Sequence, residues 1–185
     1  SARFRYPDGA HDVEALAVDW ETGTPYLLGK SGAGGDAWRV PLPLDPDWSP
    51  TTPGTFVPVS SGAPLPSQVT AADAGRDANR LVLRTYFQGF EYLRPPGQPF
   101  EALFAAVPCT FGVPLVGQYE AFALTPKGDG WFTTTELVLG EAAPLHRADA
   151  VPAPTPAILS GTPTEAGQAA FVLEVREASG ARATR

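Results

Sequence analysis

The fold is decided by residues 11–19, His11-Asp12-Val13-Glu14-Ala15-Leu16-Ala17-Val18-Asp19. Between Asp12 and Asp19 this segment is apolar except for one acidic side chain, Glu14. A turn at residues 21–23 and a second apolar run follow, which is typical of an antiparallel hairpin. Residues 37–40 alternate as a third strand after a glycine-rich loop. The sequence therefore predicts an antiparallel meander, three strands joined by turns.

The hairpin pattern occurs three times. Residues 117–125 repeat it closely, and a weaker copy begins at residue 68; a turn and a second apolar strand follow each copy. Aligning Glu14, Thr70 and Glu120 gives a repeat length of roughly 50 residues, which is typical of propellers, solenoids and arrays. We therefore expect an all-β chain with about three repeated sheets. They fall near residues 2–45, 55–105 and 106–148.

Composition indicates a globular, turn-rich protein. Hydrophobic residues make up 43% of the 185 positions and charged residues 18%, and the 21 Pro and 19 Gly favour short strands and many turns. Helical periodicity is weak, and only residues 100–106 could form a turn of helix. The net charge of −7 argues against nucleic acid or an anionic membrane as a partner. No apolar run approaches the roughly 20 residues of a membrane span.

The beginning of the chain and its composition predict that it is part of a longer bacterial protein. The chain opens on residues 2–6, which already have the pattern of a strand, without an initiating Met or a signal peptide. Arg outnumbers Lys, and Ala, Pro and Gly are abundant, a bias typical of GC-rich bacterial genomes. Cys109 is the only cysteine, so no disulfide can form within the chain.

A proline-rich linker, residues 151–157, is expected to separate the repeats from a tail, residues 158–185. The tail contains the run Ser160-Gly161-Thr162-Pro163-Thr164-Glu165-Ala166-Gly167 and an alternating strand at residues 171–175. These residues resemble the last third of a bacterial cadherin-like immunoglobulin-type module. The resemblance implies a β-hairpin tail that is part of a β-sandwich.

The repeats resemble bacterial secreted β-propellers, the group that contains phytase-like and esterase-like propeller domains. The segments that carry this resemblance are Tyr6-Pro7-Asp8-Gly9, residues 12–19, Leu83-Arg84-Thr85-Tyr86 and Glu120-Ala121-Phe122-Ala123. The resemblance implies an extracellular or cell-surface location. Complete propellers have about 4 to 8 blades, so three blades would form an open arc with exposed sheet edges, suited to a protein partner or to self-association.

In such propellers the innermost strands carry acids that line a central ion or ligand site. By this resemblance Asp12, Glu14 and Glu120 are candidate metal ligands, whereas Thr70 departs from the acidic pattern. Converging carboxylates would suit Ca²⁺, which takes six to eight oxygen ligands. Alternatively, each acid caps amides of a neighbouring blade or pairs with a basic side chain such as Lys30.

Three further residues are candidate ligand contacts. Lys30 and Glu136 are polar positions that follow Glu14 and Glu120, respectively, at the same spacing along the chain. Arg84, on an apolar strand, either contacts an anion in the axial channel or forms a charge-assisted hydrogen bond to an acid such as Asp73. We expect the pairing with an acid.

The sequence contains no strong catalytic motif, because the segment around Lys30 fails the phosphate-loop template and His11, His146 and Cys109 lack metal or nucleophile spacing. The first hypothesis is therefore a secreted, non-catalytic module that binds a protein or ligand through its blade loops. The second is a Ca²⁺-dependent phosphoester or ester hydrolase. In it, Asp12, Glu14 and Glu120 would hold the ion and Arg84 or Lys30 the anionic group. The third is a structural repeat unit of a larger assembly.

Overall fold

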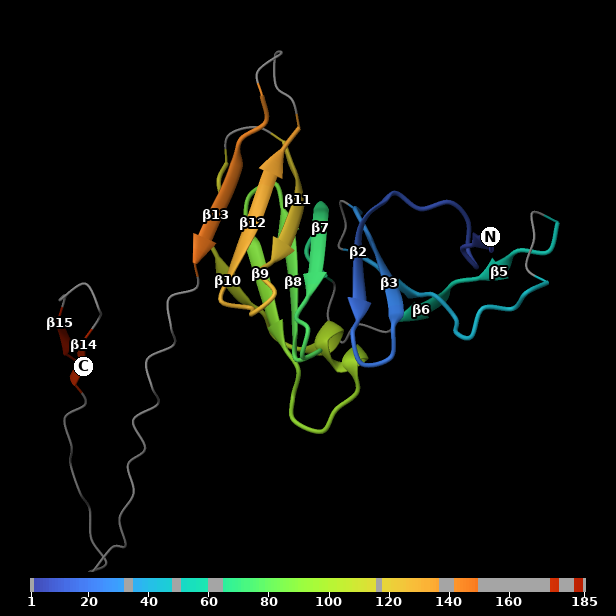
Figure 1. Cartoon of the computed structure of the whole chain (residues 1–185), viewed down its shortest axis with the longest axis horizontal. Coiled ribbons are helices and arrows are strands. Elements are labelled where there is room, and N and C mark those ends of the chain that lie inside the picture. Colours follow the sequence, from blue (N-terminus) through green and yellow to red (C-terminus); the bar gives the residue numbers. More distant parts are fainter. Residues whose placement is uncertain are drawn as a thin grey trace, which may run out of the picture. The chain divides into compact units, whose positions relative to one another are not determined.

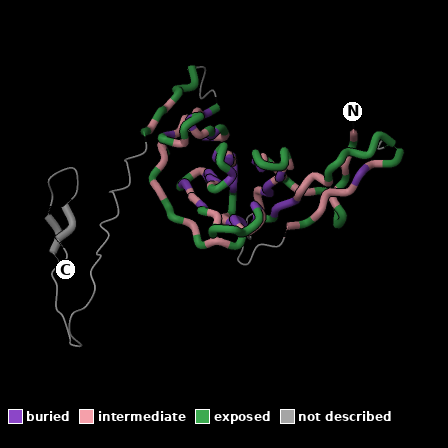
Figure 2. Tube along the Cα trace, turned by 60° about the horizontal axis from the view of Figure 1, so that its bottom comes forward, coloured by how far each residue is buried: buried purple, intermediate pink, exposed green. Residues whose placement is uncertain are grey.

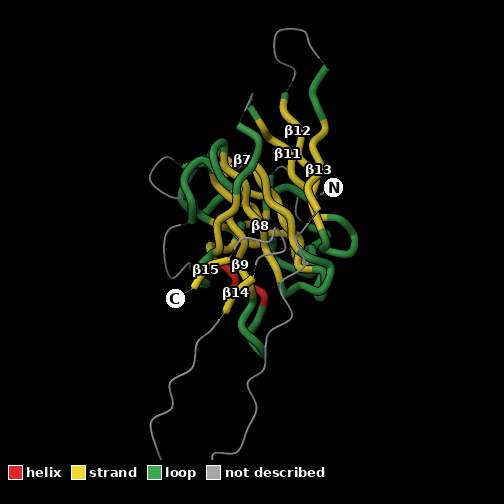
Figure 3. The backbone as a smooth tube through the Cα atoms, turned by 90° about the vertical axis from the view of Figure 1, so that its left-hand side faces the viewer, coloured by secondary structure: helices red, strands yellow, loops and turns green. Residues whose placement is uncertain are grey.

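A computed structural model describes residues 2–31, 35–47, 51–59, 65–115, 118–136 and 142–149, and the backbone of 174–176 and 182–184. The chain divides into two compact units, Ser1–Pro152 and Ala153–Arg185. The described residues form β-sheets and one short 3₁₀ helix, so the all-β class is confirmed (Figures 1 and 3). Over the same residues, no helix has both the length and the apolar character needed to cross a membrane.

Three antiparallel meanders follow one another in the first unit (Figure 1). The first meander consists of β2 (Val13–Asp19), β3 (Thr24–Gly29), β4 (Ala37–Arg39) and β6 (Val57–Val59). The second consists of β7 (Val69–Ala74), β8 (Arg80–Thr85), β9 (Gly89–Leu93) and β10 (Cys109–Phe111). The third consists of β11 (Tyr119–Leu124), β12 (Gly130–Thr135) and β13 (Leu145–Asp149).

The remaining elements are small. β1 (Phe4–Arg5) pairs in parallel with β5 (Gly54–Thr55). The helix η1 (Phe100–Ala105) lies between β9 and β10. In the second unit, β14 (Glu174–Arg176) and β15 (Arg182–Thr184) pair antiparallel. The predicted linker and the run at residues 160–167 lie outside the described residues.

The first two strands of each meander share one register. Val13 pairs with Gly29, Val69 with Thr85 and Tyr119 with Thr135, and the next pairing in each hairpin skips one residue of the first strand. The skipped residues are Glu14, Thr70 and Glu120. These are the three positions that were aligned in the sequence, so they are also equivalent in strand pairing. Each first strand has a β-bulge near its beginning.

The boundary expected between the second and third repeats, at residues 105/106, is corrected by the pairing. β10 pairs with β9 and so completes the second meander. Residues 100–105 form η1, in the segment where the sequence allows a turn of helix. Phe100, Leu103 and Phe104 on this helix are buried in the core, which explains why it packs against the sheet rather than extending it.

The first strands β2, β7 and β11 pack side by side, with β7 in the middle (Figure 1). We call the side of each meander that faces the next meander in sequence its forward face, and the opposite side its rear face. The forward face of the first meander, with Ala15 and Tyr26, packs on Leu81 and Leu83 of the second. The forward face of the second, with Ala71 and Val82, packs on Phe122 of the third. The buried positions accordingly lie between meanders (Figure 2).

The turns at the opposite end from the bulges also repeat. The amides of Ala78 and Gly128 donate to the carbonyls of Gly75 and Thr125 at 2.8 Å in both cases. Gly128 has a φ of 70°, and Ala78 has a φ of 53°, in the left-handed region that glycine adopts at least cost. The second meander thus keeps a turn geometry that its residue does not favour, because the hairpin register requires it.

Candidate functional site

A charged network joins the bulge ends of the three meanders. The Lys30 ammonium nitrogen lies 2.8 Å from Glu14 Oε1 and donates to the Tyr86 hydroxyl oxygen at 2.6 Å. The Tyr86 hydroxyl in turn donates to Glu120 Oε1 at 3.2 Å. Glu14 and Glu120 are the bulge residues of the first and third meanders, and a bulge redirects its side chain. Successive side-chain contacts therefore connect all three meanders.

Tyr86 is a member of this network that sequence reasoning missed. The second strand of each hairpin is followed directly by a polar residue: Lys30, Tyr86 or Glu136. Each of these residues lies at the same distance along the chain from the bulge residue of its own hairpin. The same offset applied to Thr70 would have identified Tyr86. It was overlooked because the middle repeat lacks an acid at the bulge.

The network holds one cation between two carboxylates. Partial burial favours neutral Lys30, but its hydrogen bonds to Glu14 and Tyr86 outweigh this effect, so the pKa of Lys30 is raised. The ammonium also lies 4.9 Å from the centroid of the Tyr86 ring, within the range of a cation–π contact. The group therefore stays charged at neutral pH and neutralises one of the two acids.

Asp12 and Glu136, two further candidate residues at the bulge end, make backbone hydrogen bonds but contribute no side chain to the network. The Asp12 carbonyl accepts a 2.8 Å hydrogen bond from the Lys30 amide, and the Glu136 amide donates one of 2.8 Å to the Gln118 carbonyl. These bonds are equivalent in the first and third repeats. The side chains of Asp12 and Glu136 are exposed and take no part in the network.

The metal prediction for Asp12, Glu14 and Glu120 gains no support from this geometry. Within the described ranges, no three His, Cys, Asp or Glu side chains gather closely enough to hold a metal ion. Lys30 neutralises Glu14 directly, at 2.7 Å from Oε2, and reaches Glu120 through Tyr86. An ammonium thus already supplies one positive charge between the two carboxylates.

Arg84 does not form the predicted pair with an acid such as Asp73. Its Nη2 donates to the Pro114 carbonyl at 2.8 Å, and its guanidinium carbon lies 4.5 Å from the centroid of the Tyr119 ring. Its side chain is fully buried, and neither Nε nor Nη1 has a hydrogen-bond partner among the described residues. Within the described part of the chain, Arg84 is therefore a buried cation without a facing carboxylate, an unusual and costly arrangement.

Asp73 bonds across the interface between the second and third meanders instead. One carboxylate oxygen accepts from the Leu124 amide at 2.8 Å, and the other accepts from the Ala74 amide at 2.9 Å. Burial raises the pKa of Asp73, although these two hydrogen bonds act in the opposite direction. The Thr70 hydroxyl makes a parallel connection by donating to the Tyr119 carbonyl at 2.9 Å.

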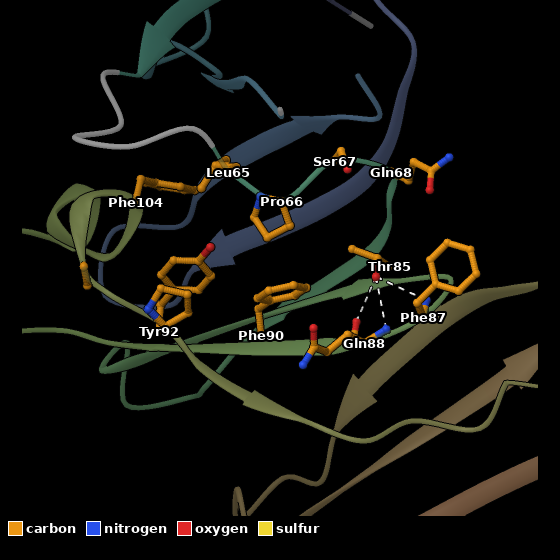
Figure 4. Close-up of a pocket in the computed structure, with 12 residues that line it drawn as sticks. Leu65, Pro66, Ser67, Gln68, Thr85, Phe87, Gln88, Phe90, Tyr92 and Phe104 are labelled. Carbon is orange, nitrogen blue, oxygen red and sulfur yellow. Dashed lines mark hydrogen bonds between the residues drawn. The ribbon is translucent and has the colours of Figure 1, made fainter. Parts of the chain in front are cut away.

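A pocket of about 450 Å³ is lined by residues on both sides of Tyr86 in the sequence, Thr85 and Phe87 (Figure 4). Its walls come from the segment that leads into β7, the turn between β8 and β9, and η1 with the residues that follow it. The residues that line it are Leu65, Pro66, Ser67, Gln68, Thr85, Phe87, Gln88, Phe90, Tyr92, Phe104, Ala106 and Pro108. The lining combines four aromatic side chains with hydroxyl and amide groups, a composition typical of small-ligand and peptide sites.

The turn from Thr85 to Gln88 connects the pocket to the network. The Thr85 hydroxyl accepts from the amides of Phe87 and Gln88 at 3.3 and 3.1 Å and donates to the Gln88 carbonyl at 3.1 Å (Figure 4). Tyr86 reaches the network from this turn, while Phe87 lies at the pocket and is 70% exposed. One turn therefore presents a hydroxyl bonded to the charged network and an exposed aromatic side chain next to each other.

The hydroxyl of Thr85 is used within the turn, and Cys109 is exposed on β10, where it pairs in register with Glu91 of β9. No protein-family model and no curated protein matches this sequence.

Proposed function

We propose that residues 2–149 form three consecutive blades of a β-propeller and act as a non-catalytic binding module of a bacterial secreted or cell-surface protein. The blade interpretation is supported by three meanders of equal hairpin register whose first strands pack side by side. The antiparallel pairing of β14 with β15 supports a tail of immunoglobulin-type character.

The observation that carries the binding function is the position of the turn from Thr85 to Gln88. It places exposed Phe87 at a pocket with aromatic walls and Tyr86 in the network of Glu14, Lys30 and Glu120. Exposed aromatic residues beside a preformed pocket are typical of recognition surfaces. The binding surface is thus formed by loops at the bulge end of the blades.

The proposed ligand is a protein segment with an aromatic or aliphatic side chain that enters the pocket. Phe90, Tyr92 and Phe104 provide the apolar contact, and Gln68 and Gln88 provide hydrogen-bond donors and acceptors for a peptide backbone. The network carries one net negative charge beside the pocket. A basic residue next to the apolar one would therefore be favoured.

Selection of a random-peptide display library on the immobilised chain tests this proposal. We expect enrichment of peptides with an aromatic or aliphatic residue beside Lys or Arg. Substitution Ser67→Trp fills the pocket from its exposed rim and should abolish their binding. The matched substitution Gln98→Trp alters an exposed groove at the other end of β9 and should leave binding unchanged.

Two results would contradict the proposal. The first is the absence of any enriched peptide. The second is enrichment of peptides whose binding survives Ser67→Trp, because the ligand would then contact another surface. Circular dichroism of both variants shows whether the fold is kept.

A further inference from the structure

The forward face of the third meander is exposed at positions that are buried in the other two meanders. Ala121 is equivalent in register to Ala15 and Ala71, which are 4% and 6% exposed. Ala121 itself is exposed, as is Ala123 two residues further along the strand. Leu145, on β13 at the far side of β12, is 69% exposed and shares this face through its pairing with Thr134. At Ala121 and Ala123 this face therefore repeats the small apolar residues of the two internal interfaces but has no neighbour among the described residues, while its β13 edge carries the exposed ion pair of Arg147 and Asp149.

The rear face of the first meander is also exposed at positions whose equivalents in the other meanders are buried. Leu16 is 52% exposed, whereas its register equivalent Phe122 is 8% exposed, because Phe122 packs on Ala71 of the second meander. Leu27 is partly exposed, whereas its equivalent Leu83 is fully buried. The second meander, which has a neighbour on each side, buries both of its faces.

We propose that these two faces bind each other between two copies of this chain. Within the chain, a forward face receives the rear face of the next meander twice, at the first–second and second–third interfaces. The forward face of the third meander and the rear face of the first are the two halves of one more interface of this kind. Ala121 of one copy then contacts Leu16 of the other, as Ala71 contacts Phe122 within the chain.

The number of blades determines how many copies take part. A head-to-tail contact either closes into a ring or continues as a filament. Closed propellers contain about 4 to 8 blades. One copy would supply three blades and three copies nine, whereas two copies supply six, so a two-copy ring is the arrangement that closes. This inference rests on the blade architecture proposed above and not on the pocket.

The mass of the full chain in solution tests the inference, using variants that introduce a charge on one of the two faces. By light scattering, wild type should have twice the 19.5 kDa mass of one chain. Ala121→Arg and Leu16→Glu should each give 19.5 kDa, because each places a charge in both interfaces of the ring. An equimolar mixture of the two variants should regain the dimer mass, since one interface is then native and the other pairs Arg with Glu.

Val107→Glu is the matched control, because Val107 is 92% exposed and lies on neither face. It should keep the dimer mass. A wild-type mass of 19.5 kDa at every concentration would overturn the inference. So would dimers that survive both single variants, a mixture that stays monomeric, or growth into larger assemblies. The peptide selection probes the pocket separately, so a monomer that still selects peptides refutes the ring alone.

Discussion

The Arg84 guanidinium stacks on the Tyr119 ring at 4.5 Å, and no acidic side chain of the described residues pairs with it. Burial lowers the pKa of Arg84 to about 10, but the group remains charged at neutral pH. Its equivalent in the first meander is Leu28, which is also fully buried. The interface between meanders therefore accepts an aliphatic side chain at this register position.

We predict that Arg84→Leu raises the free energy of unfolding by about 1–4 kcal/mol, the gain seen when buried ionic groups are replaced by apolar ones of similar size. Urea denaturation measures the change. Arg84→Lys keeps the charge and should bring no gain. Loss of stability in the leucine variant would mean that the cation has a counter-charge that stabilises the fold.

Gly89 should not tolerate a side chain. It pairs with Phe111 on β10, and a Cβ at this position would overlap the Phe111 ring. That ring contacts both Phe122 and Trp131, with centroids at 6.3 and 6.0 Å. We predict that Gly89→Ala lowers the free energy of unfolding by about 1–3 kcal/mol through overpacking.

The cost of Gly89→Ala should fall when Phe111 is shortened to Leu. The double variant should therefore be more stable than the sum of the two single effects predicts, as measured by thermal unfolding. Strict additivity would show that the two positions do not touch.

The repeated hairpins could be predicted from sequence because their signal is local. The two apolar runs within residues 13–28, the turn between them and their recurrence around Thr70 and Glu120 predict paired strands. The common offset from each bulge position to Lys30, Tyr86 or Glu136 follows from equal hairpin length. β10 was assigned to the wrong repeat because so short a strand has no periodicity to detect. Its place is decided by pairing with β9, which sequence alone does not reveal.

The candidate site was predictable only in part, for a related reason. Glu14, Lys30 and Glu120 were identified and do belong to one network, but the link through Tyr86 depends on packing between meanders. Asp73 was expected to pair with Arg84, yet the Leu124 amide from the next meander takes that place. The pocket is assembled from three segments distant in sequence, so no single stretch encodes it.

Calcium should have little effect on the folded protein. Because Lys30 neutralises Glu14 and reaches Glu120 through Tyr86, we predict an unchanged melting temperature when Ca²⁺ is added or chelated. Differential scanning calorimetry makes the comparison, with Mg²⁺ as the control ion. A rise in melting temperature specific to Ca²⁺ would favour the hydrolase hypothesis, since a bound ion stabilises the state that holds it.

Alkaline pH should unfold the protein through its buried tyrosines. Burial raises the pKa of Tyr92 to about 12, and burial together with the Glu101 and Asp19 charges also raises the pKa of Tyr26. In the unfolded chain a tyrosine ionises near pH 10. The unfolded state therefore loses the proton first, so stability is full below about pH 10 and falls as the pH rises toward 12.

Tyrosinate absorbance and circular dichroism, followed together, measure this transition. We expect part of the absorbance change to coincide with unfolding, and Tyr92→Phe to reduce the loss of stability with pH. Full tyrosine ionisation in a folded chain would contradict the assigned burial.

The most direct test of the account is whether Tyr86 is energetically coupled to both neighbouring meanders. Double-mutant cycles pair Tyr86→Phe with Lys30→Met and, separately, with Glu120→Gln, using urea denaturation. We predict a coupling free energy of about 0.5–1 kcal/mol in each cycle, since residues in one hydrogen-bond network are not additive. Additivity within about 0.3 kcal/mol in either cycle would contradict the convergence of the three bulge ends.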